Sequence, residues 1–377
     1  MNKQMIFKIL KNTAAVIVML ALFIIIYYQN RDRGFTKLLK NDKTESVEVN
    51  NNLSKAFEGF TSGDVFAIED KVAFVTSNTY GFVDAGGQGT YKSIAVSSPI
   101  LHGEGEFVIY YGEDSKEATV CRKDREYYKI TCDNKILKAK VNRNGYAVVA
   151  AGKEGYNSEV MVYNKQGEAI FKWDISTGEL IDFDLNCDNN KLVLSLAVAG
   201  DNILIGELEF IDITQAVVEN DVQFESEVYY NVDFNRDGTF IAVGSSKISY
   251  FNRDGSLKWE KEYEGKSLIK ADVSDIGMPV LAYLAAGSGV KGNATEIELL
   301  NRLGKITANT VIDSVADAIC VNNGQVVVAF GKKAVVMDSS LNVVNEISAD
   351  TGIKKMAFFA DGKHLFVIGN SGGMITK

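Results

Sequence analysis

The residues best suited to acid–base chemistry in this 377-residue chain are its two histidines. His102 lies in the stretch LHGEGE beside Glu104 and Glu106, where an imidazole and carboxylates could exchange protons. His364 follows an Asp-Gly-Lys sequence that is typical of an exposed turn. A Ser-His-Asp set or a pair of glycosidase carboxylates depends on which residues meet in space, and spacing along the chain points to neither. We therefore assign no catalytic residue and expect both histidines at the surface.

Two stretches have the spacing of ligand-binding motifs. Residues 287–292 read GSGVKG, but a GxGxxG binds pyrophosphate only where a strand turns into a helix, and here strand-like PVLAYLAA and EIELL flank it. Residues 182–190 read DFDLNCDNN, which resembles the start of an EF-hand calcium loop. Its sixth and twelfth positions hold Cys187 and Val193 instead of Gly and Glu. We interpret the first as a hairpin loop and the second as a strand with one solvated face, and we predict no metal and no cofactor.

The four cysteines have neither CxxC spacing nor the pattern of a disulfide framework. We expect buried free thiols, because unpaired cysteine is among the most often buried residue types. Cys121 and Cys132 lie in neighbouring strands of one predicted hairpin, so a disulfide between Cys121 and Cys132 stays open as an alternative. The cysteines are Cys121, Cys132, Cys187 and Cys320.

The elements that would position these residues are short strands joined by tight turns. Residues 231–265 read NVDFNRDGTFIAVGSSKISYFNRDGSLKWEKEYEG, in which NRDG occurs twice. Asp-Gly favours hairpin turns, and the alternating apolar runs between the turns are typical of strands. Four antiparallel strands of this length make a unit of about 40 residues, the size of a propeller blade. The predicted strands are 229–233, 239–243, 247–251 and 257–262.

Copies of this unit occur along most of the chain. The second clear copy is AKVNRNGYAVVAAG with EVMVYNKQGEAIFKWD, and its Trp173 falls where Trp259 falls in the first. Seven complete units and a partial eighth recur at spacings of about 37 to 50 residues. A partial sheet exposes a strand edge, so we expect a strand from about 44–60 to complete it. The sequence thus predicts an all-β fold, an eight-bladed β-propeller, with seven blades as the alternative.

The stretch GSSKISYFNRDGSLKWEKEY resembles the repeat of quinoprotein-like (PQQ-type) and WD40-like propellers, on Gly244, Asp254, Gly255 and Trp259. The layout of one N-terminal anchor and a propeller resembles an uncharacterised family of membrane-anchored propellers in Gram-positive bacteria related to Clostridium. The first resemblance implies a fold and not quinone chemistry, since the chain has no adjacent cysteines and only two tryptophans. Both tryptophans are expected to pack between blades.

The N-terminal part differs in composition from the repeats. Residues 12–30 carry no charge and are long enough to span a membrane, and no cleavage site follows, so we predict a retained signal anchor. Lysines flank the span on both sides; we expect the propeller outside the cytoplasm, with a cytoplasmic propeller as the alternative. The predicted parts are a basic tail (1–11), a transmembrane helix (12–30), a juxtamembrane linker (31–56) and the propeller (57–377).

Composition and loops suggest a binding role. The net charge is −9, and the repeats show no basic cluster, which argues against nucleic acid as a partner. We predict a non-enzymatic scaffold that binds a protein or a cell-envelope polymer through inserted loops. The alternatives are an enzyme (a hydrolase, lyase or cofactor-dependent oxidoreductase) with a site in the propeller channel, and a small-ligand sensor. The candidate contact residues are Ser288, Lys291, Asn293, Lys153, Tyr156, Asp114 and Lys116.

Overall fold

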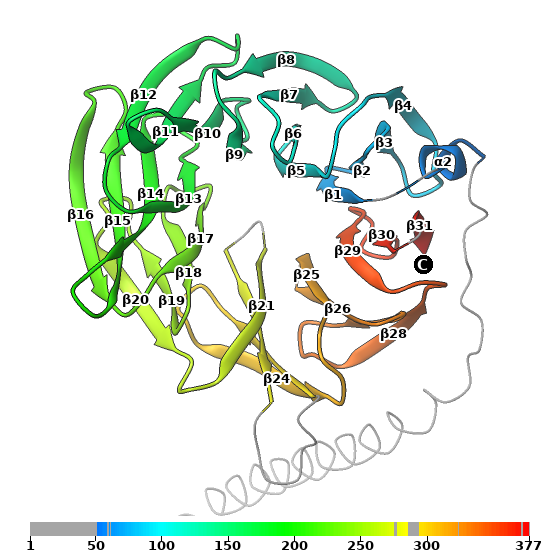
Figure 1. The fold of residues 1–377 in the computed structure, drawn as a ribbon. Coiled ribbons are helices and arrows are strands. Elements are labelled where there is room, and N and C mark those ends of the chain that lie inside the picture. Colours follow the sequence, from blue (N-terminus) through cyan, green and yellow to red (C-terminus); the bar gives the residue numbers. More distant parts are fainter. Residues whose placement is uncertain are drawn as a thin grey trace, which may run out of the picture. The chain divides into compact units, whose positions relative to one another are not determined.

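The fold is an eight-bladed β-propeller (Figure 1). A computed structural model describes residues 51–58, 60, 62–274, 277–285, 294–322, 324–370 and 372–376. In these ranges thirty-one strands form eight antiparallel sheets, seven of four strands and one of three. The predicted all-β class and the eight blades are confirmed, and the seven-bladed alternative is wrong.

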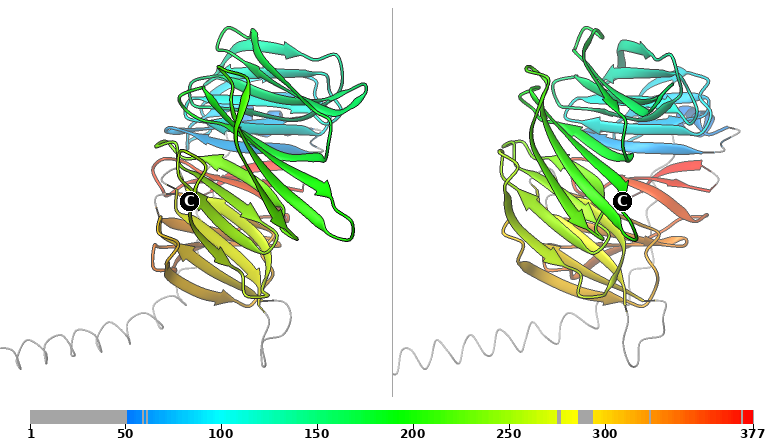
Figure 2. Two further views of the ribbon diagram at one scale, coloured as in Figure 1. Left: turned by 90° about the vertical axis from the view of Figure 1, so that its left-hand side faces the viewer. Right: turned by 60° about the vertical axis from the view of Figure 1, so that its left-hand side comes forward.

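The first four blades follow one another from residue 63 to residue 225. Blade 1 contains β1 (Gly63–Ile68), β2 (Lys71–Thr76), β3 (Thr79–Val83) and β4 (Gly89–Ser93). Blade 2 contains β5 (Pro99–Glu104), β6 (Phe107–Gly112), β7 (Glu117–Arg122) and β8 (Arg125–Thr131). Blade 3 contains β9 (Ile136–Val141), β10 (Ala147–Lys153), β11 (Tyr156–Tyr163) and β12 (Ala169–Ile175). Blade 4 contains β13 (Glu179–Leu185), β14 (Lys191–Ala199), β15 (Leu204–Asp212) and β16 (Val217–Glu225). In Figure 2 the long strands of blade 4 (bright green) extend past those of blade 5.

The remaining blades complete the ring. Blade 5 contains β17 (Tyr229–Phe234), β18 (Phe240–Gly244), β19 (Lys247–Phe251) and β20 (Leu257–Glu262), within one residue of the predicted strands. Blade 6 contains β21 (Ser267–Val273), β22 (Pro279–Leu284), β23 (Thr295–Leu300) and β24 (Ile306–Ile312). Blade 7 contains β25 (Ala318–Asn322), β26 (Gln325–Phe330), β27 (Lys333–Met337) and β28 (Val343–Ser348). Blade 8 contains β29 (Ile353–Phe358), β30 (Leu365–Gly369) and β31 (Gly372–Thr376).

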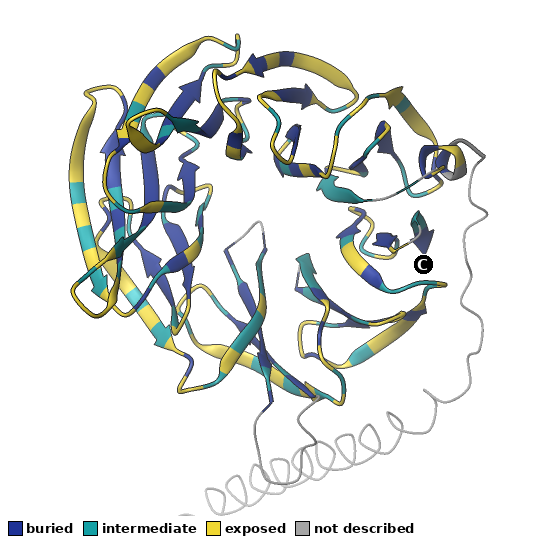
Figure 3. Ribbon diagram, in the orientation of Figure 1, coloured by how far each residue is buried: buried dark blue, intermediate teal, exposed yellow. Residues whose placement is uncertain are grey.

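The core lies between neighbouring blades. The middle strands of each sheet are mostly buried, whereas the fourth strands are mostly exposed and interrupted by half-buried or buried residues (Figure 3). β10, for example, is almost entirely buried, and β16 has no buried residue. A meander of this kind cannot bury both of its faces alone, so each sheet buries them against the next one around the ring.

The repeated Asn-x-x-Gly sequences form the turns. In the 252–255 turn the glycine N–H donates to the Asn252 carbonyl at 3.0 Å, and Gly255 has a φ of 79°, a value that glycine adopts freely. In the equivalent turn at 301–304 the Asn301 side chain accepts two further backbone N–H groups, those of Leu303 and Lys305. The same sequence therefore recurs because each hairpin needs the same backbone geometry.

The meander sorts its loops onto two faces of the ring. Loops that join the second strand of a blade to the third share one face with the linkers between blades; we call this the linker face. Loops that join the first strand to the second, and the third to the fourth, lie on the other face, which includes the Asn-x-x-Gly turns; we call this the turn face. This follows from the antiparallel order of every sheet.

The tryptophans pack between blades, as predicted. The indole N–H of Trp259, on the outer strand of blade 5, donates to the Arg302 carbonyl in a turn of blade 6 at 3.0 Å. A Cβ added at Gly304 in that turn would lie 2.6 Å from the Trp259 ring. The turn glycine therefore serves two needs, a positive φ and room for the neighbouring ring.

Replacing Gly304 with alanine should destabilise the propeller by about 1–3 kcal/mol more than replacing Gly155. Both glycines have positive φ, 73° and 81°, so both substitutions carry a backbone cost of about 1–2 kcal/mol. A Cβ at Gly155 meets nothing within 4 Å, whereas one at Gly304 displaces Trp259. Urea unfolding of the two variants measures the difference, and equal losses would show that the Trp259 contact contributes nothing.

Blade 8 has three strands among the described residues. Within the range of about 44–60 from which a fourth strand was predicted, residues 51–56 form the helix α2 (Asn51–Ala56), and residues 44–50 lie outside the described ranges. Leu53 and Ala56 of α2, together with Phe57, pack in one cluster with side chains of blades 1 and 8. An apolar helical turn therefore covers the seam at which the two ends of the propeller meet.

The predicted membrane anchor, residues 12–30, lies outside the described ranges. Within those ranges no helix has the length and apolar character needed to cross a membrane.

All four cysteines are free, as predicted. Their burial differs from the expectation, because Cys187 and Cys320 are only partly buried while Cys121 and Cys132 are buried. The alternative of a disulfide between Cys121 and Cys132 is wrong. Cys121 pairs with Glu126 across the hairpin, and Cys132 lies beyond the end of β8.

Candidate binding site: the charged central channel

A cavity of about 530 Å³ opens at the turn-face end of the central channel. Its lining comes mainly from the first strands of blades 1 to 6 and the turns that follow them. The lining is polar apart from two aromatic rings and a few small residues. The residues that matter for its chemistry are Phe66, His102, Glu104, Lys140, Arg143, Asp184, Asn231, Asp233, Phe234 and Asp272.

The inner strands place these side chains by bonding to one another. The first strand of each blade pairs with the second on one edge, so its other edge leaves backbone N–H groups facing the channel. In six cases a side chain on the first, innermost strand of one blade accepts a hydrogen bond from a backbone N–H of the next blade. The pairs are Asp64 with Leu101, His102 with Val141, Glu104 with Arg143, Asp182 with Val232, Asp184 with Phe234 and Asp272 with Val321.

Lys140 is the centre of a buried network that joins three blades. Its side chain is 6% exposed, and its Nζ lies 2.9 Å from Asp182 Oδ2 and 3.3 Å from Asp233 Oδ1. It also donates to the Val232 carbonyl at 3.0 Å. Lys138 pairs with the other oxygen of Asp182 at 2.7 Å. Blades 3, 4 and 5 are therefore held together by charge-assisted bonds inside the channel.

Burial and neighbouring charges set the protonation states. Burial and the nearby Lys140 lower the pKa of His102 to about 4, so the imidazole is neutral at pH 7. Burial opposes the charge of Lys140, but the carboxylates of Asp182, Asp233 and Asp184 outweigh it and raise the Lys140 pKa. Burial also favours the neutral form of Asp182, yet the two lysines overcome this and lower its pKa.

Asp184 behaves differently from Asp182, two residues earlier. Burial raises its pKa well above the ordinary value, and Asp233 and Glu104 add to the effect, while Lys140 opposes it. Its Oδ2 accepts the Phe234 N–H at 2.7 Å. Asp184 lines the cavity, and it forms no ion pair among the described residues.

Replacing Asp184 with asparagine should raise the melting temperature by about 2–4 °C at pH 8. Because the folded-state pKa is raised, the carboxyl favours folding only while it is protonated. That contribution is complete below the unfolded pKa and is lost as pH rises through the folded pKa. Asparagine cannot ionise, yet its amide oxygen can still accept the Phe234 N–H. Thermal unfolding between pH 4 and pH 8 should show the gain growing with pH, and a constant or negative difference would contradict the assignment.

The structure corrects two predictions about this region. His102 was expected at the surface, but it lines the channel cavity. The stretch 182–190 does begin in a strand, β13, but its predicted solvated face is buried, with Asp182 at 0% and Asp184 at 6% exposure. Within the described ranges no three His, Cys, Asp or Glu side chains are placed to hold a metal ion. His364 lies in a turn as predicted, partly buried against Asp361 at 2.5 Å.

The sequence did not single out Lys140, Arg143 or Asp233. A signal was present, because charged or amide residues alternate with one small or apolar residue on the first strands of blades 3 to 6. These triplets read KAK, DFD, NVD and KAD, ending at Lys140, Asp184, Asp233 and Asp272.

Four of the candidate contact residues are among the described ones, and these four lie on the linker face. Asp114 is in the loop between β6 and β7 and pairs with Lys135 at 2.9 Å; Lys116, in the same loop, is exposed. In the next blade Lys153 bridges Glu159 and Asp174 and lies over the ring of Tyr156, which is 43% exposed. Ser288, Lys291 and Asn293 lie outside the described residues. Their loop joins β22 and β23, which pair as a hairpin.

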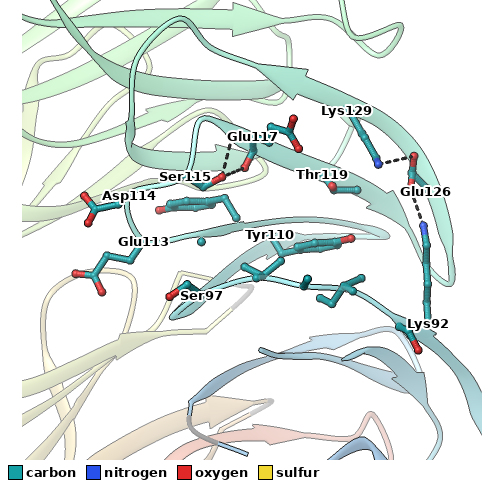
Figure 4. A pocket seen from close by; sticks show the side chains of 16 residues that line it. Lys92, Ser97, Tyr110, Glu113, Asp114, Ser115, Glu117, Thr119, Glu126 and Lys129 are labelled. Carbon is teal, nitrogen blue, oxygen red and sulfur yellow. Dashed lines mark hydrogen bonds and ion pairs between the residues drawn. The ribbon is translucent and has the colours of Figure 1, made fainter. Parts of the chain in front are cut away.

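Two hollows border the described loops. A groove of about 520 Å³ separates the outer parts of blades 1 and 2, and one of about 440 Å³ lies beside Lys153 and Trp173. Figure 4 shows Tyr110 in the first groove, the Lys92–Glu126 pair at one end, and Asp114 at the other.

Comparison with known proteins gives a family for the chain. Residues 40–375 match the model of a family of unknown function, DUF5711. The chain belongs to the DUF5711 family. No curated protein sequence matches it. The match spans all eight blades, so this propeller is an example of the DUF5711 fold.

Solved structures similar to this DUF5711 chain are WD40-type and other propellers. The C-terminal WD40 domain of Sif2 has a TM-score of 0.60 at 11% identity, covering 84% of this chain and 96% of that one. The Dos1 propeller has a TM-score of 0.55 at 16% identity, with coverages of 84% and 92%. The β-propeller domain of Myceliophteria thermophila Cps50 (Swd1) has a TM-score of 0.51 at 9% identity, with coverages of 75% and 97%. At these identities the likeness shows the fold alone.

Proposed function

We propose that this DUF5711 protein is a non-enzymatic scaffold, held at the membrane by residues 12–30, which binds a partner protein or a cell-envelope polymer through its linker face. The observation that carries the proposal is the pair of hollows beside the loops of blades 2 and 3. Concave, partly polar surfaces next to exposed tyrosine and lysine side chains are suited to binding a partner.

The state of the channel residues supports a binding role over the enzyme alternative. His102, Glu104 and Asp182 accept backbone N–H groups of the next blade, and Glu104 and Asp182 also form ion pairs. A general base needs a free lone pair within reach of a substrate proton. The Nδ1 lone pair of His102 is already occupied by the Val141 N–H.

The contact face can be tested by site-specific photo-crosslinking in cells. A photoreactive residue at Asp114 or at Tyr156 should crosslink to the same partner, because both positions are on the linker face. Leu303, which is 63% exposed on the turn face, is the control position and should not crosslink to it. Crosslinking at Leu303 with none at Asp114 or Tyr156 would overturn the assignment of the face.

The membrane side can be tested with a cysteine at the exposed Asp114 position. We expect a membrane-impermeant thiol reagent to label the Asp114→Cys variant in intact cells, which places the propeller outside the cytoplasm. The unmodified chain, whose own cysteines are at least partly buried, supplies the background. Labelling that requires permeabilised cells would place the propeller in the cytoplasm instead.

A further inference from the structure

The channel cavity combines carboxylates with two aromatic walls. Asp184 and Asp233 line it, and Phe66 and Phe234 line it as well. The Phe66 ring lies against Gly103, where a Cβ would come within 2.3 Å of it, so this wall is fixed by close packing. Anionic oxygens beside aromatic faces are the surroundings that organic cations prefer.

Acidic side chains outnumber basic ones in the cavity lining: Glu69, Glu104, Glu106, Asp184, Asp233 and Asp272 against Lys140, Arg143 and Arg236. Two lysines, Lys138 and Lys140, face three carboxylates, those of Asp182, Asp184 and Asp233. Asp182 contacts both lysines and Asp233 shares one of them, whereas Asp184 is left without an ion pair among the described residues. The neighbouring Glu104 brings its own cation, because Arg143 Nε lies 2.7 Å from it.

We propose that this cavity binds a small organic cation, an ammonium or guanidinium group, which pairs with Asp184 and Asp233 between Phe66 and Phe234. A metal ion fits less well, since hard cations need several oxygen ligands converging on one point and the described residues supply no such group. A volume of about 530 Å³ accommodates a short diamine or the end of a lysine or arginine side chain. The site stands apart from the linker-face scaffold role and does not depend on it.

Protonation of Asp184 competes with the cation. In the empty site its carboxyl holds a proton more readily than an exposed aspartate does, because burial and the charges of Asp233 and Glu104 outweigh the opposing Lys140. His102, which also lines the cavity, is neutral at pH 7. The other charged side chains of the lining are Glu69, Glu106, Arg143, Arg236 and Asp272. A bound cation favours the ionised carboxyl, so binding should release a proton and strengthen as pH rises through the raised pKa.

The test is calorimetric titration of the full-length protein in detergent at low salt. One probe is putrescine, and the other is an acetyl-Gly-Lys-Gly-amide peptide. Titrations in two buffers with different ionisation heats measure the protons released. We expect saturable binding of at least one probe, proton release on binding, and at least tenfold weaker binding by the Asp184→Asn variant. Tighter binding of putrescine would identify a free amine as the ligand class, and tighter binding of the peptide a basic side chain of a partner.

The matched control is Asp313→Asn, an acid-to-amide change at an exposed position of the β24–β25 linker on the opposite face. Its affinity for the probe should stay within twofold of the unmodified protein. The proposal is overturned if neither probe binds saturably, or if Asp184→Asn binds as tightly as the unmodified chain. Asparagine keeps the size of the side chain and an acceptor for the Phe234 N–H. A loss of binding by this variant therefore reports the missing charge, provided that its thermal unfolding shows it to be folded.

Discussion

Replacing Lys140 with methionine is expected to lower the free energy of unfolding by about 3–5 kcal/mol, the usual effect of removing one partner from a buried ion pair. The substitution leaves the buried Asp182 and Asp184 beside the partly exposed Asp233, and removes the lysine that contacts both Asp182 and Asp233. Urea unfolding followed by tryptophan fluorescence suits this measurement. Trp173 and Trp259 lie in blades 3 and 5, two of the three blades that Lys140 joins.

The loss should depend on pH in a defined direction. In the unmodified chain the lysines lower the pKa of Asp182, so this pairing stabilises the fold above the unfolded pKa and is lost as pH falls through the folded one. Lys140→Met lacks that stabilisation. The difference in free energy of unfolding between the unmodified chain and Lys140→Met should therefore become smaller in acid.

Lys138→Met is the matched control, on the same strand and beside the same carboxylate. Its side chain is 37% exposed, so we expect a loss of about 1 kcal/mol or less. If Lys140→Met cost no more than Lys138→Met at pH 7, the network would not be what joins blades 3, 4 and 5.

Replacing Phe74 with alanine should also destabilise the propeller by about 3–5 kcal/mol. Phe74 is fully buried at the seam of the ring, where it stacks on Phe57 at 5.2 Å and on Phe366 at 5.0 Å. This aromatic cluster joins side chains of blade 1 and blade 8 with Phe57, which follows α2. Removing its central ring leaves a cavity that spans both chain ends of the propeller.

Hydrogen exchange can localise the effect. In Phe74→Ala the amides of blades 1 and 8 should exchange faster, while those of blades 4 and 5, on the opposite side of the ring, keep their protection. Phe74→Leu fills more of the space and should cost less than about 1.5 kcal/mol. Uniform loss of protection in all blades, or a loss of stability below about 1 kcal/mol, would contradict a specific role at the seam.

The closure of the ring could be predicted from the sequence only in part. A partial eighth unit indicated that something from the N-terminal side must cover blade 8, and residues 53–57 do so. The predicted strand is not tested at residues 44–50, which lie outside the described ranges. Residues 51–56, NNLSKA, form a short helix, and its apolar Leu53 and Ala56, with Phe57 directly after it, are spaced for one helical face.

What the sequence by itself determined is the repeated hairpin. Asn-x-x-Gly turns and period-two apolar runs are local features, and they specified strands within one residue in blade 5, the antiparallel meander and the eight-bladed ring. Only the tertiary structure decided which polar residues form a site. Lys140 meets Asp182 and Asp233, which follow it by 42 and 93 residues, because closing the ring brings the inner strands of successive blades side by side. The two-residue period of a strand predicts which face of the sheet a residue lies on. Its burial, its charged partners and its place in a cavity depend on the neighbouring blades.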